Sequence, residues 1–250
     1  MATYLEGVYW DLDGTIANTE LEAHLPAFNY AFNDFNLNWN WDRSTYLDLL
    51  KINGGKNRIS YYSKLIKKSL NNQEVKKIHE RKQYHYINYV KNNNVISLKP
   101  GVYRLIKELQ KNKVRQFIVT SSSKKQAKLI TNQLFIEFNP FEFIISSDDV
   151  QFHKPNPLPY LKAIKLSGIK LNKSIVFEDS IPGLRSSLAA KLPTIYVPSN
   201  IPAIIEKDMN LDCFIDSLGN ESCMANVVKG PQLVSNYVDY AYLEKYLMTF

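Results

Sequence analysis

Short apolar segments, each followed directly by polar or acidic residues, recur along this chain and constrain its fold more than any other feature. These segments are rich in β-branched and aromatic residues, which is typical of strands buried on both faces of a sheet. Segments with helical periodicity separate them. We expect strands at 5–12, 116–120, 141–146, 174–177 and 194–197, and helices at 101–111, 124–134, 157–166 and 182–190. This alternation predicts an α/β fold in which helices cover both faces of a parallel sheet.

A block rich in Asn, Lys and Tyr interrupts this pattern after the first strand. Its apolar residues recur at helical spacing, as in Leu21, Leu25 and Phe28. We therefore expect helices at 20–36, 46–50, 58–70 and 73–90, with Trp39 and Trp41 as packing residues. The predicted domain organisation is a core of residues 1–17 plus 96–250, with a helical domain of residues 18–95 inserted into it.

The composition narrows the class of protein. Hydrophobic residues make up 45% of the 250 and charged residues 22%, which excludes a disordered chain, a collagen-like repeat and a coiled coil. The two cysteines, Cys213 and Cys223, are too few for a disulfide scaffold, and no apolar run is long enough to span a membrane. With no visible signal peptide, we expect a cytoplasmic protein. The formal net charge of +7 leaves open a nucleic acid, an anionic small molecule or a bias in composition.

Side chains suited to catalysis follow the predicted core strands. They are Asp11 and Asp13 after the first, Thr120 at the end of the second, Lys154 after the third, and Glu178 and Asp179 after the fourth. Because sites in open parallel sheets form outside the carboxyl ends of the strands, we expect these residues to converge in one crevice. Clustered carboxylates suit Mg²⁺ rather than zinc, and they repel one another unless Mg²⁺ or a lysine neutralises them.

Such a crevice suits phosphoryl transfer, since the phosphoryl oxygens need charge neutralisation as the transfer proceeds. A carboxylate can itself accept the phosphoryl group as an aspartyl phosphate. Asp13, two residues beyond Asp11, can act first as general acid and then as general base on a water molecule.

Four segments resemble, in order, the four motifs of the haloacid dehalogenase (HAD) superfamily of phosphotransferases. They are VYWDLDGTIANTE (8–20), FIVTSSS (117–123), HKPNPLPY (153–160) and VFEDSIPGL (176–184). The resemblance implies a Rossmann-like HAD core with an inserted helical cap domain of the C1 type. It implies that Asp11 is the nucleophile and Asp13 the acid/base, and that Thr120 and Lys154 contact the phosphoryl group. Mg²⁺ would be held by Asp11, the main-chain carbonyl of Asp13, Asp179 and, directly or through water, Glu178.

Within the inserted block, four segments resemble the CbbY-type sugar bisphosphatases, which remove a phosphate from xylulose 1,5-bisphosphate. They are NTELEAH (18–24), AFNYAFNDFNLNWNW (27–41), TYLDLLKINGGKNRI (45–59) and HERK (79–82). The resemblance implies substrate contacts from Glu20, Asn53, Gly54, Gly55, Lys56, Arg58, Arg81 and Lys82, and we add His24 and Ser121 as candidates. A glycine pair before a helix N-terminus, with Lys56 and Arg58, suits a phosphate group. Lys191 departs from relatives, which often have glycine there.

The sequence therefore predicts an Mg²⁺-dependent phosphatase that acts on a small sugar (bis)phosphate through an aspartyl phosphate. We expect a monomer with no nucleic-acid or membrane partner. Two alternatives stay open. A β-phosphoglucomutase-like mutase shares every core residue, and only the loop around the glycine pair argues against it. A non-catalytic protein could keep the fold and use its basic surface on nucleic acid.

Overall fold

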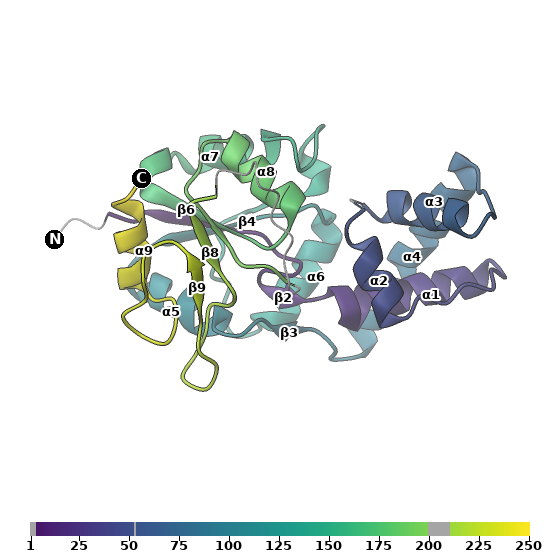
Figure 1. Cartoon of the computed structure of the whole chain (residues 1–250), viewed down its shortest axis with the longest axis horizontal. Helices are drawn as coiled ribbons and strands as arrows, with labels where there is room; N and C mark the ends of the chain where they lie inside the picture. Colours follow the sequence, from purple (N-terminus) through teal and green to yellow (C-terminus); the bar gives the residue numbers. More distant parts are fainter. Residues whose placement is uncertain (1–3, 53, 200–210) are drawn as a thin grey trace. The chain divides into compact units, whose positions relative to one another are not determined.

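The computed structural model describes residues 4–52, 54–199 and 211–250. The chain divides into two compact units (Figure 1): unit 1 combines the described residues of 1–18 and 97–250, and unit 2 those of 19–96. These boundaries lie one residue beyond those expected from the sequence. The chain leaves unit 1 after β2 (Ala17–Asn18) and returns at β3 (Ser97–Leu98), and these two short strands pair antiparallel.

Within the described residues, unit 1 contains a seven-stranded sheet in the order β5-β4-β1-β6-β7-β8-β9. Its strands are β1 (Gly7–Trp10), β4 (Arg115–Val119), β5 (Ile144–Ile145), β6 (Ser174–Glu178), β7 (Thr194–Tyr196), β8 (Cys213–Ile215) and β9 (Val227–Lys229). All neighbours are parallel except β8 and β9. Trp10 lies opposite both Ile118 and Phe177, so β1, β4 and β6 end at the same level.

The strand order changes direction between β1 and β6. From β1 the chain continues to β4 on one side, whereas from β6 it continues to β7 on the other. Ligands of open α/β sheets bind at this kind of switch point, outside the carboxyl ends of the strands.

Helices cover both faces of the sheet. They are α5 (Val102–Lys111), α6 (Lys124–Leu134), α7 (Leu158–Ser167), α8 (Ile181–Ala189) and α9 (Tyr240–Leu247), with short 3-10 turns η2 (Ser147–Asp149) and η3 (Leu171–Lys173). On one face Tyr9 packs into a buried cluster with residues of α7. On the other, Trp10 stacks on Phe177 and donates to Gln116, whose amide donates to a main-chain carbonyl of α5. Burial on both faces explains the apolar strand segments and confirms the predicted α/β architecture.

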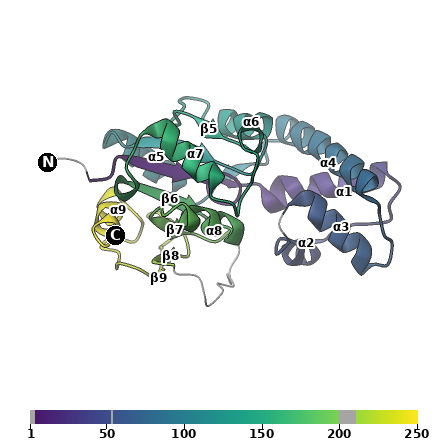
Figure 2. The same cartoon turned by 90° about the horizontal axis from the view of Figure 1, so that it is seen from above.

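Within its described residues, all the regular secondary structure of unit 2 is helical. Its elements are the π-helix η1 (Glu20–His24) and the α-helices α1 (Leu25–Asp34), α2 (Arg43–Leu49), α3 (Gly55–Leu65) and α4 (Asn72–Asn92). Helices α1 and α4 lie side by side (Figure 2). The start of α4 is fixed by a reciprocal capping box between Asn71 and Glu74. Trp39 and Trp41 are buried in the aromatic core of this unit, which confirms their interpretation as packing residues.

Some elements differ from the sequence prediction. The strand expected at 141–146 is paired only at Ile144–Ile145, and the helix expected at 58–70 begins at Gly55 and ends at Leu65. No element was predicted beyond residue 197, where the structure has β8, β9 and α9. The two strands are short and their sequences lack a clear hydrophobic period, so these elements are recognised only from their packing in the fold. In α9, for example, the Tyr246 hydroxyl donates to the carbonyl of Thr194 over 3.1 Å. Of the helices in the described part of the chain, none has the length and hydrophobicity that a bilayer crossing requires.

Candidate active site

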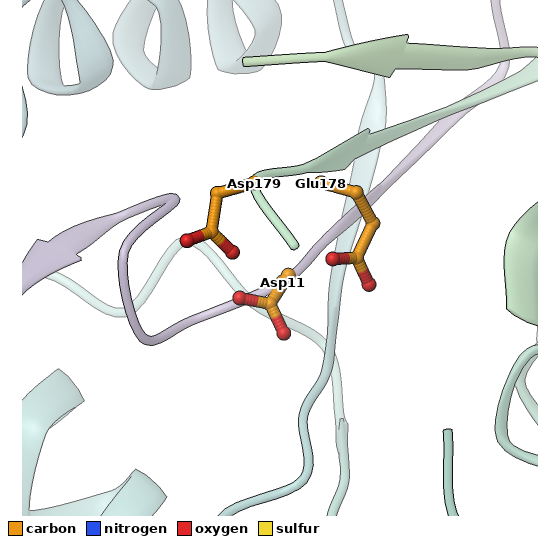
Figure 3. A group of neighbouring side chains, drawn as sticks. All are labelled: Asp11, Glu178 and Asp179. Carbon is orange, nitrogen blue, oxygen red and sulfur yellow. The ribbon is translucent and has the colours of Figure 1, made fainter. Parts of the chain in front are cut away.

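Three buried carboxylates meet at the carboxyl ends of β1 and β6. Asp11 directly follows β1, Glu178 ends β6 and Asp179 is the next residue. Each offers an oxygen that lies within 4.8 Å of the oxygens offered by the other two (Figure 3). The parallel register of β1 and β6 produces this meeting, because it brings the two strand ends to the same level.

Lys154 links two of these carboxylates. Its Nζ donates to Asp11 Oδ1 over 2.7 Å, to Glu178 Oε1 over 2.5 Å and to the carbonyl of Val119 over 2.8 Å. Tyr160, on α7, donates to the same Glu178 oxygen over 2.5 Å. A buried ammonium with this many partners is held in one position.

Burial and the ion pair between Lys154 and Asp11 shift the pKa values at this site in opposite directions. Burial raises the pKa of Asp11, and although Lys154 lowers it, Glu178 and Asp179 add to the increase, so the pKa lies well above its ordinary value. Burial lowers the pKa of Lys154, but the charges of Asp11 and Glu178 outweigh that effect and raise it overall. If all are ionised, three carboxylates and one ammonium leave an excess of negative charge. Oxygen donors with an excess negative charge fit a divalent hard cation such as Mg²⁺.

Two glycines allow the carboxylates to approach the main chain. Gly14 has a φ of +90°, and a Cβ there would lie 2.1 Å from Asp179 Oδ2. Gly183, in the first turn of α8, would place a Cβ 1.8 Å from Glu178 Oε2. Neither position accepts a side chain while the carboxylate stays in place. Thr15 supports the same arrangement by donating to Asp179 Oδ1 over 3.3 Å.

The turn after β4 carries the predicted hydroxyl group. Thr120 is buried, and its Oγ1 accepts the main-chain N–H of Ser122 over 3.0 Å. Ser121 is exposed, whereas Ser123 is the N-cap of α6. Ser122 donates from its own hydroxyl to Asp13 Oδ2 over 2.6 Å. The structure thus brings Asp11, Lys154, Glu178 and Asp179 together within unit 1. Asp13 contacts the turn that carries Thr120 through its hydrogen bond with Ser122.

The sequence reasoning did not assign the contacts that Ser122, Tyr160 and Gly183 make at this site. Each lies inside a motif that was recognised, but none has a local pattern that reveals its partner. Tyr160, six residues after Lys154, falls in the first turn of α7, and only the fold brings its hydroxyl to Glu178.

Within unit 2, two predicted substrate residues lie together near α2. Tyr46 donates to Glu20 Oε2 over 2.5 Å, and Arg58 lies 3.7 Å from the same oxygen. Arg58 also donates from Nε to the carbonyl of Ile52 over 2.9 Å. Glu20 lies in the π-helix η1, and π-helical turns are frequent at functional sites.

A second pair, His24 and Lys82, lies inside unit 2. Lys82 is buried, its Nζ is 2.6 Å from His24 Nδ1, and it lies over the rings of Phe28 and Tyr86. His24 also stacks on Tyr86, with ring centroids 4.3 Å apart. Lys82 is therefore fixed by its packing rather than placed on an exposed face.

The other predicted substrate residues are placed differently. Gly54 and Gly55 are the N-cap and the first residue of α3, and Lys56 is exposed. Arg81 forms an ion pair with Asp34, which His85 also contacts, and Arg81 stacks on Tyr84. Asn53 lies outside the described residues. Substrate contact by all of these residues stays a prediction.

Comparison with known proteins agrees with this geometry. Residues 8–197 match the family described as haloacid dehalogenase-like hydrolase. The chain is 32% identical over 197 residues to protein CbbY of Rhodobacter capsulatus. The aligned region covers 78% of this chain and 86% of that protein. It is 26% identical over 196 residues to a phosphorylated carbohydrates phosphatase of Thermotoga maritima, covering 77% of this chain and 84% of that protein.

Two crystal structures are also similar. CbbY from Rhodobacter sphaeroides in complex with phosphate is 30% identical, with a TM-score of 0.74, covering 85% of this chain and 94% of that one. A mutant of that protein in complex with xylulose-(1,5)bisphosphate is 29% identical, with a TM-score of 0.75, covering 87% and 98%. These similarities confirm the family, the fold and the CbbY-like character inferred from the motifs.

Proposed function

Because this chain belongs to the haloacid dehalogenase-like hydrolase family, we propose that it is an Mg²⁺-dependent phosphatase of a small phosphorylated sugar. The observation that carries the proposal is the buried cluster of Asp11, Lys154, Glu178 and Asp179. It provides a nucleophile, a fixed cation and oxygen ligands at the switch point of the sheet.

We propose that Asp11 attacks phosphorus and forms an aspartyl phosphate while the bond to the sugar oxygen breaks. Asp13 gives its proton to that oxygen. A water molecule, losing a proton to Asp13, then attacks phosphorus and the bond to Asp11 breaks, which releases phosphate. Lys154 neutralises part of the charge on the phosphoryl group, and Thr120 contacts its oxygens.

The donor set supports Mg²⁺ as the cofactor. The side chains of Asp11, Glu178 and Asp179, with the main-chain carbonyl of Asp13, would hold it. When bound, the ion supplies charge neutralisation for the phosphoryl oxygens. The chain's own contribution is to keep these oxygens in place, through Lys154, Tyr160 and Thr15.

For the substrate we propose a sugar bisphosphate such as xylulose 1,5-bisphosphate. Unit 2 supports this choice by placing Arg58 beside Glu20 and by presenting Lys56 at the start of α3. A carboxylate accepts hydrogen bonds from sugar hydroxyls, and cations at a helix N-terminus bind a second phosphate. The similar protein solved with xylulose-(1,5)bisphosphate supports the same class of substrate.

Phosphate release from a panel of sugar phosphates tests the proposal. The panel contains xylulose 1,5-bisphosphate, ribulose 1,5-bisphosphate and β-glucose 1-phosphate. We expect Mg²⁺-dependent release, with xylulose 1,5-bisphosphate preferred, and at least a roughly 10³-fold loss of kcat in Asp11→Asn, because the nucleophile is removed.

Asp148→Asn is the matched control, since Asp148 is an acid outside the cluster; it lies in the turn η2 and accepts from the main chain of Lys124. It is expected to keep wild-type activity. Absence of release with Mg²⁺, or full activity in Asp11→Asn, refutes the proposal. Formation of glucose 6-phosphate from β-glucose 1-phosphate faster than release would identify a mutase instead.

A further inference from the structure

Ser122, in the turn between β4 and α6, contacts the proposed acid/base directly. Its Oγ donates to Asp13 Oδ2 over 2.6 Å, a length typical of a hydroxyl bonded to a carboxylate. Both side chains are half-buried. Neither the proposed attack on phosphorus nor the ligand set uses this hydroxyl.

The main chain of Ser122 is fixed on both sides. Its N–H donates to Thr120 Oγ1, and its carbonyl accepts from the N–H of Ser147, both over 3.0 Å. The next residue, Ser123, forms a reciprocal capping box with Gln126 at the start of α6. With the main chain held in this way, the Ser122 hydroxyl can move only by rotation about its own side chain, so it is a well-ordered donor.

We propose that Ser122 is a positioning residue that orients the carboxyl group of Asp13 for proton transfer to the leaving sugar oxygen. This inference rests on the proposed function, because Asp13 needs orienting only if it moves a proton. With Ser122 donating to Oδ2, the proton that Asp13 carries as an acid belongs on Oδ1.

The proton balance follows from this arrangement. As an oxygen of Asp11 bonds to phosphorus, the bond from phosphorus to the sugar oxygen breaks, and that oxygen keeps the electron pair and takes the proton from Asp13 Oδ1. In hydrolysis the attacking water returns a proton to Oδ1 as the bond from phosphorus to Asp11 breaks. Ser122 gains and loses nothing. Its removal therefore slows only those steps in which Asp13 must move a proton.

Substrates whose leaving groups differ in their need for a proton distinguish this positioning role from substrate binding or support of the fold. The sugar phosphate and phenyl phosphate need a proton on the departing oxygen, whereas p-nitrophenolate departs without one. Phenyl and p-nitrophenyl phosphate are matched in shape. For Ser122→Ala we expect kcat/KM to fall about 10-fold to 100-fold with the sugar phosphate, less with phenyl phosphate, and about 3-fold or less with p-nitrophenyl phosphate. KM for the sugar phosphate should stay near its wild-type value.

Two further variants complete the test. Ser122→Thr keeps the hydroxyl and should restore most of the lost activity. Ser123→Ala removes a hydroxyl from the same turn. In the described part of the chain that hydroxyl bonds to Gln126 at the start of α6, so the variant should leave the leaving-group dependence unchanged. Thermal unfolding of each variant verifies that it is folded.

An equal loss of kcat/KM with all three phosphate esters, or a loss that results from a higher KM, overturns this inference. Either result would show that Ser122 contacts substrate or supports the fold, and either would leave the proposed function intact. Failure of the proposed function looks different, because the wild-type protein would then release no phosphate that depends on Asp11.

Discussion

His79, on α4, shows how the basic character of unit 2 acts on one side chain. Burial lowers its pKa most, and electrostatic interactions with Lys82, Lys56, His24 and Arg58 lower it further, to about 3 from an ordinary value of 6.5. The imidazole is thus kept neutral among cations. A region with this excess of positive charge suits an anionic ligand better than a neutral one.

The lowered pKa of His79 predicts sensitivity to acid. Below about pH 6.5 the unfolded chain binds a proton on His79 that the folded chain does not bind, so stability falls as the pH falls toward about 3. Between pH 7 and pH 5 we expect His79 to account for a loss of about 2 kcal/mol in the free energy of unfolding. His79→Gln should remove most of this pH dependence, measured by urea unfolding at both pH values.

The control for this prediction is His153→Gln, because His153 is exposed in the loop before α7. The acid sensitivity of that variant should match the wild-type protein. Equal pH dependence in His79→Gln and wild type would contradict the argument from burial and charge.

At the scale of elements, the turn between α8 and β7 carries Lys191, at the position where the resemblance implies a glycine. Leu192 donates to the carbonyl of Ser187, and Lys191 donates to that of Leu188, which together form a Schellman motif at the end of α8. Lys191 has a φ of +59°, in the left-handed region. Glycine adopts this conformation without the steric cost that a Cβ introduces, which is why a lysine here is unfavourable.

Replacing Lys191 by glycine should therefore stabilise the protein. We expect Lys191→Gly to raise the free energy of unfolding by about 0.5–1 kcal/mol, measured by denaturant unfolding of the whole protein. Lys191→Ala keeps a Cβ and should show no comparable gain. If the glycine variant is no more stable than the alanine variant, the left-handed conformation does not carry the cost assigned to it.

At the scale of the whole molecule, both connections to unit 2 lie next to each other. Asn18 and Ser97 are paired across β2 and β3, and Asn18 Nδ2 donates to Ser97 Oγ over 3.1 Å. The carboxylate cluster and Lys154 belong to unit 1, whereas Glu20, His24, Arg58 and Lys82 belong to unit 2. This division assigns the proposed chemistry to one unit and the proposed sugar recognition to the other.

Unit 2 should therefore be removable. Joining Asn18 to Ser97 through an Asn-Gly turn closes the β2–β3 pair as a hairpin. We expect the shortened protein to fold and to keep slow hydrolysis of p-nitrophenyl phosphate, which Asp11→Asn abolishes. Its kcat/KM for the sugar bisphosphate should fall by about 100-fold or more, because binding energy from the remote part of the substrate is lost. Retention of full activity on the sugar bisphosphate would place recognition in unit 1.

The sequence by itself determined the alternating architecture, the inserted helical block and the residues at the strand ends. These features depend on local sequence. A strand buried on both faces must be apolar. In a parallel sheet, the residues that directly follow each strand lie at the carboxyl edge of the sheet, where such sites form. This reasoning placed Asp11, Asp13, Lys154, Glu178 and Asp179 after predicted strands, and the structure brings oxygens of Asp11, Glu178 and Asp179 within 4.8 Å of one another.

Only the tertiary structure decided which side chains meet. It paired Ser122 with Asp13, Tyr160 with Glu178 and Lys82 with His24, and it gave β8, β9 and α9 their places. The physical reason is that such contacts join residues far apart in the chain, and their hydrogen bonds depend on orientation as well as distance. A hydrophobic period of two or 3.6 residues indicates which face of its strand or helix a side chain lies on. It does not indicate which distant residue that side chain contacts in the folded protein.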